Sequence, residues 1–239
     1  HARCVAYGDI GDIGDMITLW GRRNSMNVQK VTWALKELDL GYERHNVGGS
    51  FGGTGTDDYL AMNPNRVVPT LRDGDVTIWE SNAIVRYLAR TYGVGRLQPK
   101  DAPEHARAEQ WMDWLTSTLN PPFFQVFFNT IRLAPDQQNA DAIAAGVDGC
   151  ARLYGQLDAH LATQPYLAGQ HFSMGDIPVG VTLYRYFNMD IERPALPNVT
   201  AWYERLQERP AYRRAVMIPF GRNVQEWDEL ETAGADQPD

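Results

Sequence analysis

Three turns in the first part of the chain combine groups that could bind a small charged ligand. One turn contains Ser25 and Asn27, a second contains Glu80, and each leads from an expected strand into an expected helix; a third segment, Val68-Pro69, stands just before a hairpin turn. Ser25 or Asn27 alone would be an ordinary helix cap. Three such turns at one edge of a sheet suit a zwitterionic peptide, with its carboxylates at the helix N-termini, its ammonium at the acidic side chain and its amides on free backbone.

The segment RVVPTLRDG, residues 66–74, places a proline among strand-forming residues, and Asp73-Gly74 is a strong hairpin signal. Proline lacks the N–H that a strand interior donates, so Pro69 fits an edge strand. The alternative is a cis Val68–Pro69 bond, which would turn the Val68 backbone outward toward a ligand, although only about 5–6% of X–Pro bonds in folded proteins are cis. From these residues alone, both possibilities stay open.

A glycine-rich stretch, GGSFG at 48–52, fits the pattern of a hydrolase nucleophile elbow. Such an elbow runs directly into a helix, whereas Gly53-Thr54-Gly55-Thr56 follow here. The five histidines of the chain offer no clear triad partner. We therefore predict a surface loop at this position.

The elements that would position the three turns form a small α/β unit. Strand patterns cover 17–21, 42–47, 67–71 and 76–79, and helical patterns follow the first strand, occupy about 57–62 and begin again at Ser81. This order predicts a mixed sheet with helices on both faces.

The rest of the chain is expected to be helical. Residues 93–103 indicate a linker, residues 104–220 a helical domain in which Pro121-Pro122 should break or kink a helix, and residues 221–239 a polar, mobile tail. Residues 1–15 contain a tandem GDI repeat and look like a leader or tag, with Met16 as the natural start. The α/β domain would then cover 16–92.

Composition excludes several classes of function. The chain has 239 residues, is 44% hydrophobic and carries a net charge of -8, which argues against a general nucleic-acid or anionic-membrane binder. Its two cysteines, Cys4 and Cys150, lie outside any metal or disulfide spacing. We therefore expect a cytoplasmic protein without a metal, in which Cys150 is a buried structural thiol.

Four segments resemble the cytosolic glutathione transferase family, and the resemblance extends from Met16 to about Phe220. In order they are NPNRVVPTL (63–71), WESNAIVRYL (79–88), HFSMGDI (171–177) and ALPNVTAWYERLQERPAYRRA (195–215). They are similar to the family's cis-proline strand, its glutathione-binding turn and helix, the capping box and hydrophobic staple of its central C-terminal helix, and its closing helices. The resemblance implies a thioredoxin-like glutathione-binding domain followed by an all-α domain that shapes the electrophile site.

The resemblance also implies roles for the three turns. The start of the first helix is similar to serine-type members, phi-like, nu-like or theta-like, so Ser25 would activate the thiol of glutathione and Asn27 would be a second contact. Asn24 is the alternative, because theta-like spacing places the hydroxyl one residue earlier. The other contacts implied are Val68 with cis-Pro69 for the cysteinyl unit, and Glu80 with Ser81 for the γ-glutamyl end.

The sequence specifies two parts of the site less closely, the glycyl end of glutathione and the electrophile site. Many relatives carry Gln or Lys where this chain has Val67, so Arg66 or the loop around Phe51 would have to bind the glycyl carboxylate. The electrophile would lie against aromatic residues of the helical domain, and the candidates are Trp114, Phe123, Phe124 and Phe127, with Phe128 beside them.

The predicted function is thus that of a glutathione transferase that takes glutathione as co-substrate and attacks a small apolar electrophile. Nu-like relatives favour the alternative of glutathione-dependent disulfide or peroxide reduction. A further alternative is a non-enzymatic protein of the same fold that binds ligands or partners. The family also implies a homodimer, with Trp111 and Asp113 near its interface.

Overall fold

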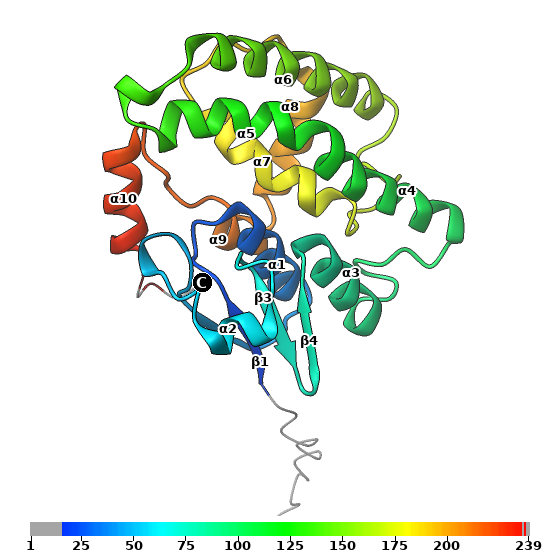
Figure 1. Ribbon diagram of the computed structural model, residues 1–239. Helices are drawn as coiled ribbons and strands as arrows, with labels where there is room; N and C mark the ends of the chain where they lie inside the picture. The colour runs from blue at the N-terminus through cyan, green and yellow to red at the C-terminus, as the bar shows by residue number, and fades with distance from the viewer. Residues whose placement is uncertain (1–15, 236, 238–239) are drawn as a thin grey trace, which may run out of the picture.

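The computed structural model describes residues 16–235 and 237, so the expected leader at 1–15 lies outside the described residues. A four-stranded sheet lies on one side and a layer of helices on the other (Figure 1). The strands are β1 (Ile17–Trp20), β2 (Tyr42–His45), β3 (Thr70–Asp73) and β4 (Val76–Trp79), in the spatial order β2-β1-β3-β4. β1 is parallel to β2 and antiparallel to β3, and β3 is antiparallel to β4. The predicted mixed sheet is confirmed.

Helices cover both sides of this sheet. They are α1 (Met26–Glu37), α2 (Asp57–Met62) and α3 (Ser81–Tyr92). α1 and α3 pack side by side between the sheet and the helical domain (Figure 1), and most of α1 is buried. β1 and β4 are both antiparallel to β3, so they run in the same direction and the turns that lead from them into α1 and α3 lie at the same end of the sheet.

The hairpin between β3 and β4 differs by one residue from the expectation. Asp73 pairs with Val76, so the two residues of the loop are Gly74 and Asp75. Gly74 has φ +55, a left-handed conformation that glycine adopts without steric cost. The predicted turn is present, with its glycine in the first loop position.

The helical domain begins with a long helical run that changes its winding twice. It comprises α4 (Ala102–Trp114), a π-helical segment (Leu115–Leu119), α5 (Asn120–Phe127) and a second π-helical segment (Phe128–Arg132). We predicted that Pro121-Pro122 would break or kink the helix; the helix does not break, and instead its winding changes directly before the prolines. These prolines cannot donate to the preceding turn, and the wider π-helical winding directly before them accommodates the lost hydrogen bonds.

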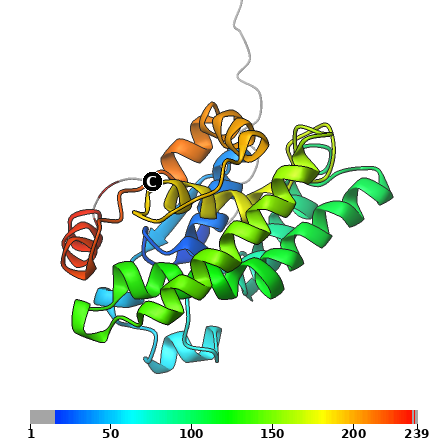
Figure 2. The ribbon, with the colours of Figure 1, turned by 90° about the horizontal axis from the view of Figure 1, so that it is seen from above.

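The remaining helices are α6 (Ala140–Leu161), α7 (Asp176–Asn188), α8 (Pro197–Gln207), α9 (Pro210–Ala215) and α10 (Val224–Ala233). Viewed from above, α5 and α6 run side by side across the molecule (Figure 2). α7 lies beneath them and is buried along almost its whole length. At its start the Asp176 carboxylate accepts from the N–H of Ser173 at 2.9 Å, the back-bond of the predicted capping box. Cys150 on α6 is fully buried, as predicted.

The C-terminal segment corrects the sequence-based expectation of a mobile polar tail. Residues 224–233 form α10, which packs beside the second π-helical segment and the glycine-rich loop (Figure 1). Trp227 is 1% exposed and Glu231 is 4% exposed. One aromatic anchor in an otherwise polar helix is too weak a pattern to reveal burial from sequence. No helix in the described part of the chain is long and apolar enough to cross a membrane.

Candidate active site

Ser25 occupies the N-cap position of α1, but its hydroxyl makes no capping hydrogen bond. Its backbone carbonyl accepts from the N–H of Gln29 at 2.8 Å, the first bond of the helix. The residue is 9% exposed and lines a cavity of about 290 Å³. The hydroxyl is therefore available to a ligand at the positive end of the helix.

This cavity lies between the α/β domain and the helical domain. From the α/β domain it is lined by the first turn, the glycine-rich loop and the residues before Pro69, and from the helical domain by aromatic and arginine side chains. The predicted site residues that line it are Asn24, Ser25, Asn27, Arg66, Val68, Phe124 and Phe127, together with Phe128. The fold thus brings together residues from distant parts of the sequence.

The Val68–Pro69 peptide bond is cis. The alternative of an edge strand is wrong, because β3 begins after the proline and lies inside the sheet, between β1 and β4. The preceding carbonyl, that of Val67, accepts from the Tyr59 hydroxyl at 2.7 Å and from Asn63 Nδ2 at 2.8 Å. Among the described residues, neither the N–H nor the C=O of Val68 has a hydrogen-bond partner, so both are available at the cavity wall.

Glu80 and Ser81 form the N-terminus of α3. Glu80 is exposed and has φ +71, a conformation that costs a non-glycine residue about 1–3 kcal/mol and is concentrated at ligand sites. Ser81 is buried; its hydroxyl donates to Asn27 Oδ1 at 3.3 Å. Asn27 therefore connects the first and third turns. Glu80 and Ser81 do not line the main cavity itself.

Lys30 is a member of this network that the sequence did not reveal. It is 2% exposed, and its Nζ donates to the Ser81 hydroxyl at 3.3 Å. Burial lowers the pKa of Lys30 to about 7, while the nearby charge of Glu80 opposes that shift. A single lysine in the middle of a helix normally indicates a solvent-facing position, so no signal in the sequence pointed to it.

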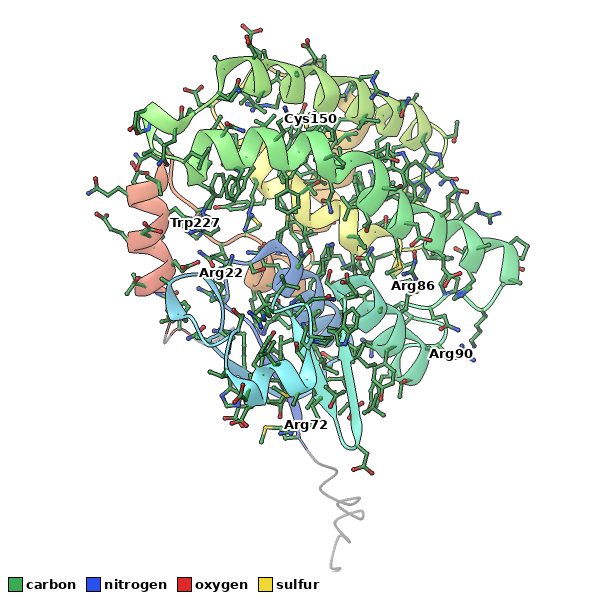
Figure 3. The ribbon with its side chains drawn as sticks, in the orientation of Figure 1. Arg22, Arg72, Arg86, Arg90, Cys150 and Trp227 are labelled. Carbon is green, nitrogen blue, oxygen red and sulfur yellow. The ribbon has the colours of Figure 1, made fainter. Side chains whose placement is uncertain are left out.

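The glycine-rich loop is held by α10. The Glu231 carboxylate accepts from the Ser50 N–H at 2.9 Å and from the Ser50 hydroxyl at 2.6 Å, and it forms an ion pair with Arg22 at 2.9 Å. Arg22 and Trp227 lie on the side of the molecule where α10 meets the α/β domain (Figure 3). Ser50 is thus a structural contact in the loop, consistent with the prediction that GGSFG is no hydrolase elbow.

Two of the predicted aromatic wall residues lie elsewhere. Phe123 is fully buried in the core behind the wall and stacks on Phe127 with ring centroids 6.3 Å apart. Trp114 packs against Trp111 at 5.2 Å and does not line the cavity. The reason is helical geometry, since one face of the α4–α5 run points to the cavity and the other into the domain.

The two candidates for binding the glycyl carboxylate of glutathione, Arg66 and the loop around Phe51, are placed differently. Arg66 lines the cavity, whereas Phe51 does not; the glycine-rich loop contributes Gly48, Gly49 and Thr54 instead. Two arginines of the helical domain that the sequence analysis missed, Arg132 and Arg185, also line the cavity, as does Trp227 of α10.

Comparisons of the sequence with family models and with known proteins all identify glutathione S-transferases. The family model for the glutathione S-transferase N-terminal domain matches residues 16–90, and the model for the C-terminal domain matches residues 140–205. The chain is 45% identical to glutathione S-transferase GstB of Escherichia coli K12, over 85% of this chain and 99% of that protein. It is 31% identical to glutathione S-transferase 3 of Zea mays, over 84% and 93% respectively.

Among solved structures, the chain is similar to the theta class glutathione S-transferase of Xanthomonas axonopodis pv. citri with glutathione bound. The identity is 49%, the TM-score is 0.83, and the match covers 86% of this chain and 99% of the other. Both the sequence and the arrangement of elements therefore match the same group of proteins.

Proposed function

The chain belongs to the glutathione S-transferase family and is a glutathione transferase, and we propose that it works by holding glutathione as a thiolate beside the Ser25 hydroxyl. The observation that carries this proposal is the uncommitted hydroxyl of Ser25 at the N-terminus of α1, in the same cavity as the free backbone of Val68. A cysteinyl unit paired with Val68 would direct its sulfur toward Ser25.

The energy that this chemistry requires is modest. A free thiol has a pKa of about 8.5, and the thiolate is the nucleophile. Lowering that pKa by about two units takes roughly 2.7 kcal/mol of preference for the anion. One charge-assisted hydrogen bond contributes about 1.5–3 kcal/mol and the helix N-terminus about 0.3–1 kcal/mol. The Ser25 hydroxyl and α1 therefore suffice without a general base.

We assign the rest of glutathione to the cavity wall and to the N-terminus of α3, which adjoins the cavity through Asn27. The Glu80 carboxylate and the N-terminus of α3 at Ser81 suit the ammonium and carboxylate of the γ-glutamyl unit. Asn27 supports this end through its hydrogen bond with Ser81. The glycyl carboxylate fits Arg66 and the glycine-rich loop, which line the same cavity. Asn24 is the weaker candidate for contact with the thiol, because its side chain takes part in a hydrogen bond that lowers the pKa of Glu231.

The second substrate is a small electrophile with an apolar body. Phe124 and Phe128 are 37% and 48% exposed at the cavity, while Phe127 is buried beneath them, so a flat apolar group has a wall to pack against. We further propose a cytoplasmic homodimer. Trp111 packs on His160 within its own domain, at 4.7 Å, so we expect Asp113 and its partner Arg86, rather than Trp111, near the dimer interface.

Calorimetric titration of glutathione in two buffers of different ionisation enthalpy tests the proposal. The difference between the two heats counts the protons released. We expect proton release near neutral pH in the wild-type protein and none in Ser25→Ala. Binding without proton release in the wild type would contradict thiolate formation. Parallel assays with an aryl halide, a hydroperoxide and a mixed disulfide separate conjugation from reduction.

A further inference from the structure

Two arginines of the helical domain line the cavity and lack an ion pair of their own among the described residues. Arg132 ends the second π-helical segment and Arg185 lies on α7, and both line the cavity that contains Ser25. Of the two other arginines that line the cavity, Arg66 lies on the α/β domain side and Arg22 is paired with Glu231. In the described part of the chain, neither Arg132 nor Arg185 forms an ion pair.

Their surroundings make this arrangement costly. Arg185 is 4% exposed, and burial together with the charges of Arg22 and Arg132 lowers its pKa to about 9. Burial and the charge of Arg22 also lower the pKa of Arg132, although Glu231 and Asp228 offset part of this. A buried cation and a partly buried cation that repel each other indicate a site for an anion, because an anion relieves both the desolvation and the repulsion.

The aromatic residues fix how these guanidinium groups are presented. Arg132 lies over the Trp227 ring at 4.2 Å, and Arg185 lies over the Phe127 ring at 4.5 Å. Stacking occupies the flat face of a guanidinium and leaves its N–H edge free for a carboxylate in the same plane. One N–H of Arg185 already donates to the Asn24 carbonyl, next to Ser25, so its position is fixed relative to the thiol site.

We propose that the second substrate carries a carboxylate on an apolar or aromatic body, and that Arg132 and Arg185 bind this carboxylate. This inference rests on the proposed function. The aromatic body packs on Phe124 and Phe128. When this substrate is an organic halide, the thiol proton goes to solvent as the thiolate forms, the sulfur forms a bond with the carbon that carries the halogen, and the halide leaves with the electrons of the carbon–halogen bond.

Glutathione itself offers a second source of carboxylate, its glycyl end. That end belongs to the α/β domain side of the cavity, where Arg66 and the glycine-rich loop lie. Arg132 and Arg185 come from the helical domain, on the same side as the aromatic wall. The observations therefore favour the electrophile, and the experiment distinguishes the two.

The test compares para-(chloromethyl)benzoate with para-(chloromethyl)benzamide, which share shape and leaving group but differ in charge. We expect wild-type kcat/KM to be about tenfold higher for the benzoate, after correction for the spontaneous reaction. Arg132→Gln should lower kcat/KM for the benzoate by about tenfold to a hundredfold, change it less than about twofold for the benzamide, and leave the KM for glutathione unaltered. Arg214→Gln, on the exposed surface of α9, is the matched control and should alter none of these values.

Equal losses for both electrophiles, or a raised KM for glutathione in Arg132→Gln, would overturn the inference and assign the arginine to the glycyl carboxylate. A wild-type protein that does not prefer the benzoate would overturn it as well. Inhibition of the wild type by para-methylbenzoate but not by para-methylbenzamide is expected too and requires no variant. Wild-type turnover of neutral chlorodinitrobenzene is measured alongside, because its absence is a failure of the proposed function and not of the anion site alone.

Discussion

Arg22 and Glu231 form an ion pair, with 2.9 Å between Nε and Oε1, that joins the turn before α1 to α10. The same carboxylate holds Ser50 in the glycine-rich loop through two hydrogen bonds. The side chain of Glu231 is 2% exposed and that of Arg22 is 17% exposed, so the pair is largely shielded from water. One carboxylate therefore fixes two segments that line the cavity.

Glu231→Gln should destabilise the protein and weaken glutathione binding, because it leaves Arg22 without its counter-charge. Removing one partner of a buried pair costs about 3–5 kcal/mol, and the partial exposure of Arg22 places the expected loss near the lower end, at about 3 kcal/mol. Urea unfolding and glutathione titration measure the two effects. Glu229→Gln, on the exposed face of the same helix, should change neither.

Glu231→Gln should also make the free energy of unfolding depend less on pH in the acid range. Burial raises the pKa of Glu231, but hydrogen bonds from Ser50 and the charge of Arg22 outweigh it, and the net shift is downward. A lowered folded-state pKa gives stabilisation that is present above the unfolded pKa of about 4.3 and is lost as pH falls through the folded value. If the free energy of unfolding falls equally with decreasing pH in Glu231→Gln and in the wild type, this carboxylate does not contribute to the loss of stability in acid.

Ser25→Ala should raise the pKa of bound glutathione toward that of the free thiol. Losing one charge-assisted hydrogen bond corresponds to about a tenfold to hundredfold fall in kcat/KM near neutral pH. Ultraviolet absorbance of the thiolate, followed against pH in the binary complex, measures this pKa directly. Thr77→Val, exposed on β4, is the control. If the thiol titrates identically in Ser25→Ala and wild type, the hydroxyl has no role in activation.

Lys30→Met should remove an alkaline rise in stability. The pKa of Lys30 falls from 10.5 to about 7 on folding, chiefly through burial. Between these values the unfolded chain binds a proton that the folded protein does not, so the free energy of unfolding rises with pH. The rise is at most about 1.4 kcal/mol per pH unit. Denaturant unfolding at pH 7 and pH 9 measures it. Lys100→Met, at an exposed lysine, should keep the slope, and a slope retained in Lys30→Met would exclude Lys30 as its source.

Two glycines of α6 should respond oppositely to alanine. A Cβ at Gly146 would lie 2.6 Å from Val126 Cγ2 and 2.9 Å from the Pro122 carbonyl oxygen, so Gly146→Ala should cost about 1–3 kcal/mol of stability by forcing α5 and α6 apart. A Cβ at Gly155 would meet nothing within 4 Å, and Gly155→Ala should stabilise by about 0.5–1 kcal/mol. Thermal unfolding compares the pair. Similar changes in both would contradict this packing.

Local patterns predicted the elements of the α/β domain well because strand alternation, turn chemistry and helix starts all operate over a few residues. The order of strands and helices and the convergence of Ser25, Asn27 and Val68 on one cavity follow from those patterns. The local residues left the Val68–Pro69 bond open between cis and an edge strand, and the family resemblance implied the cis form that the structure has. The roles of Glu80 and Ser81 in binding glutathione remain predictions.

The parts that sequence did not reveal depend on long-range packing. Lys30 is buried because α1 is enclosed by the sheet, α3 and the helical domain, and a helix enclosed on several sides no longer follows the rule that charge marks the solvent face. Arg132 and Arg185 are brought to Ser25 only when two domains pack together. Whether an aromatic residue of the α4–α5 run lines the cavity or is buried in the core likewise depends on how this helical run is rotated about its axis.

The position of Glu231 on α10 has a consequence for the order of synthesis. Arg22 and Ser50 leave the ribosome early, whereas the carboxylate that holds both of them is made after every residue that lines the cavity. A nascent chain can therefore assemble its sheet while the cavity next to it is still without one wall. The site is therefore complete only after α10 has been made and its carboxylate has paired with both segments.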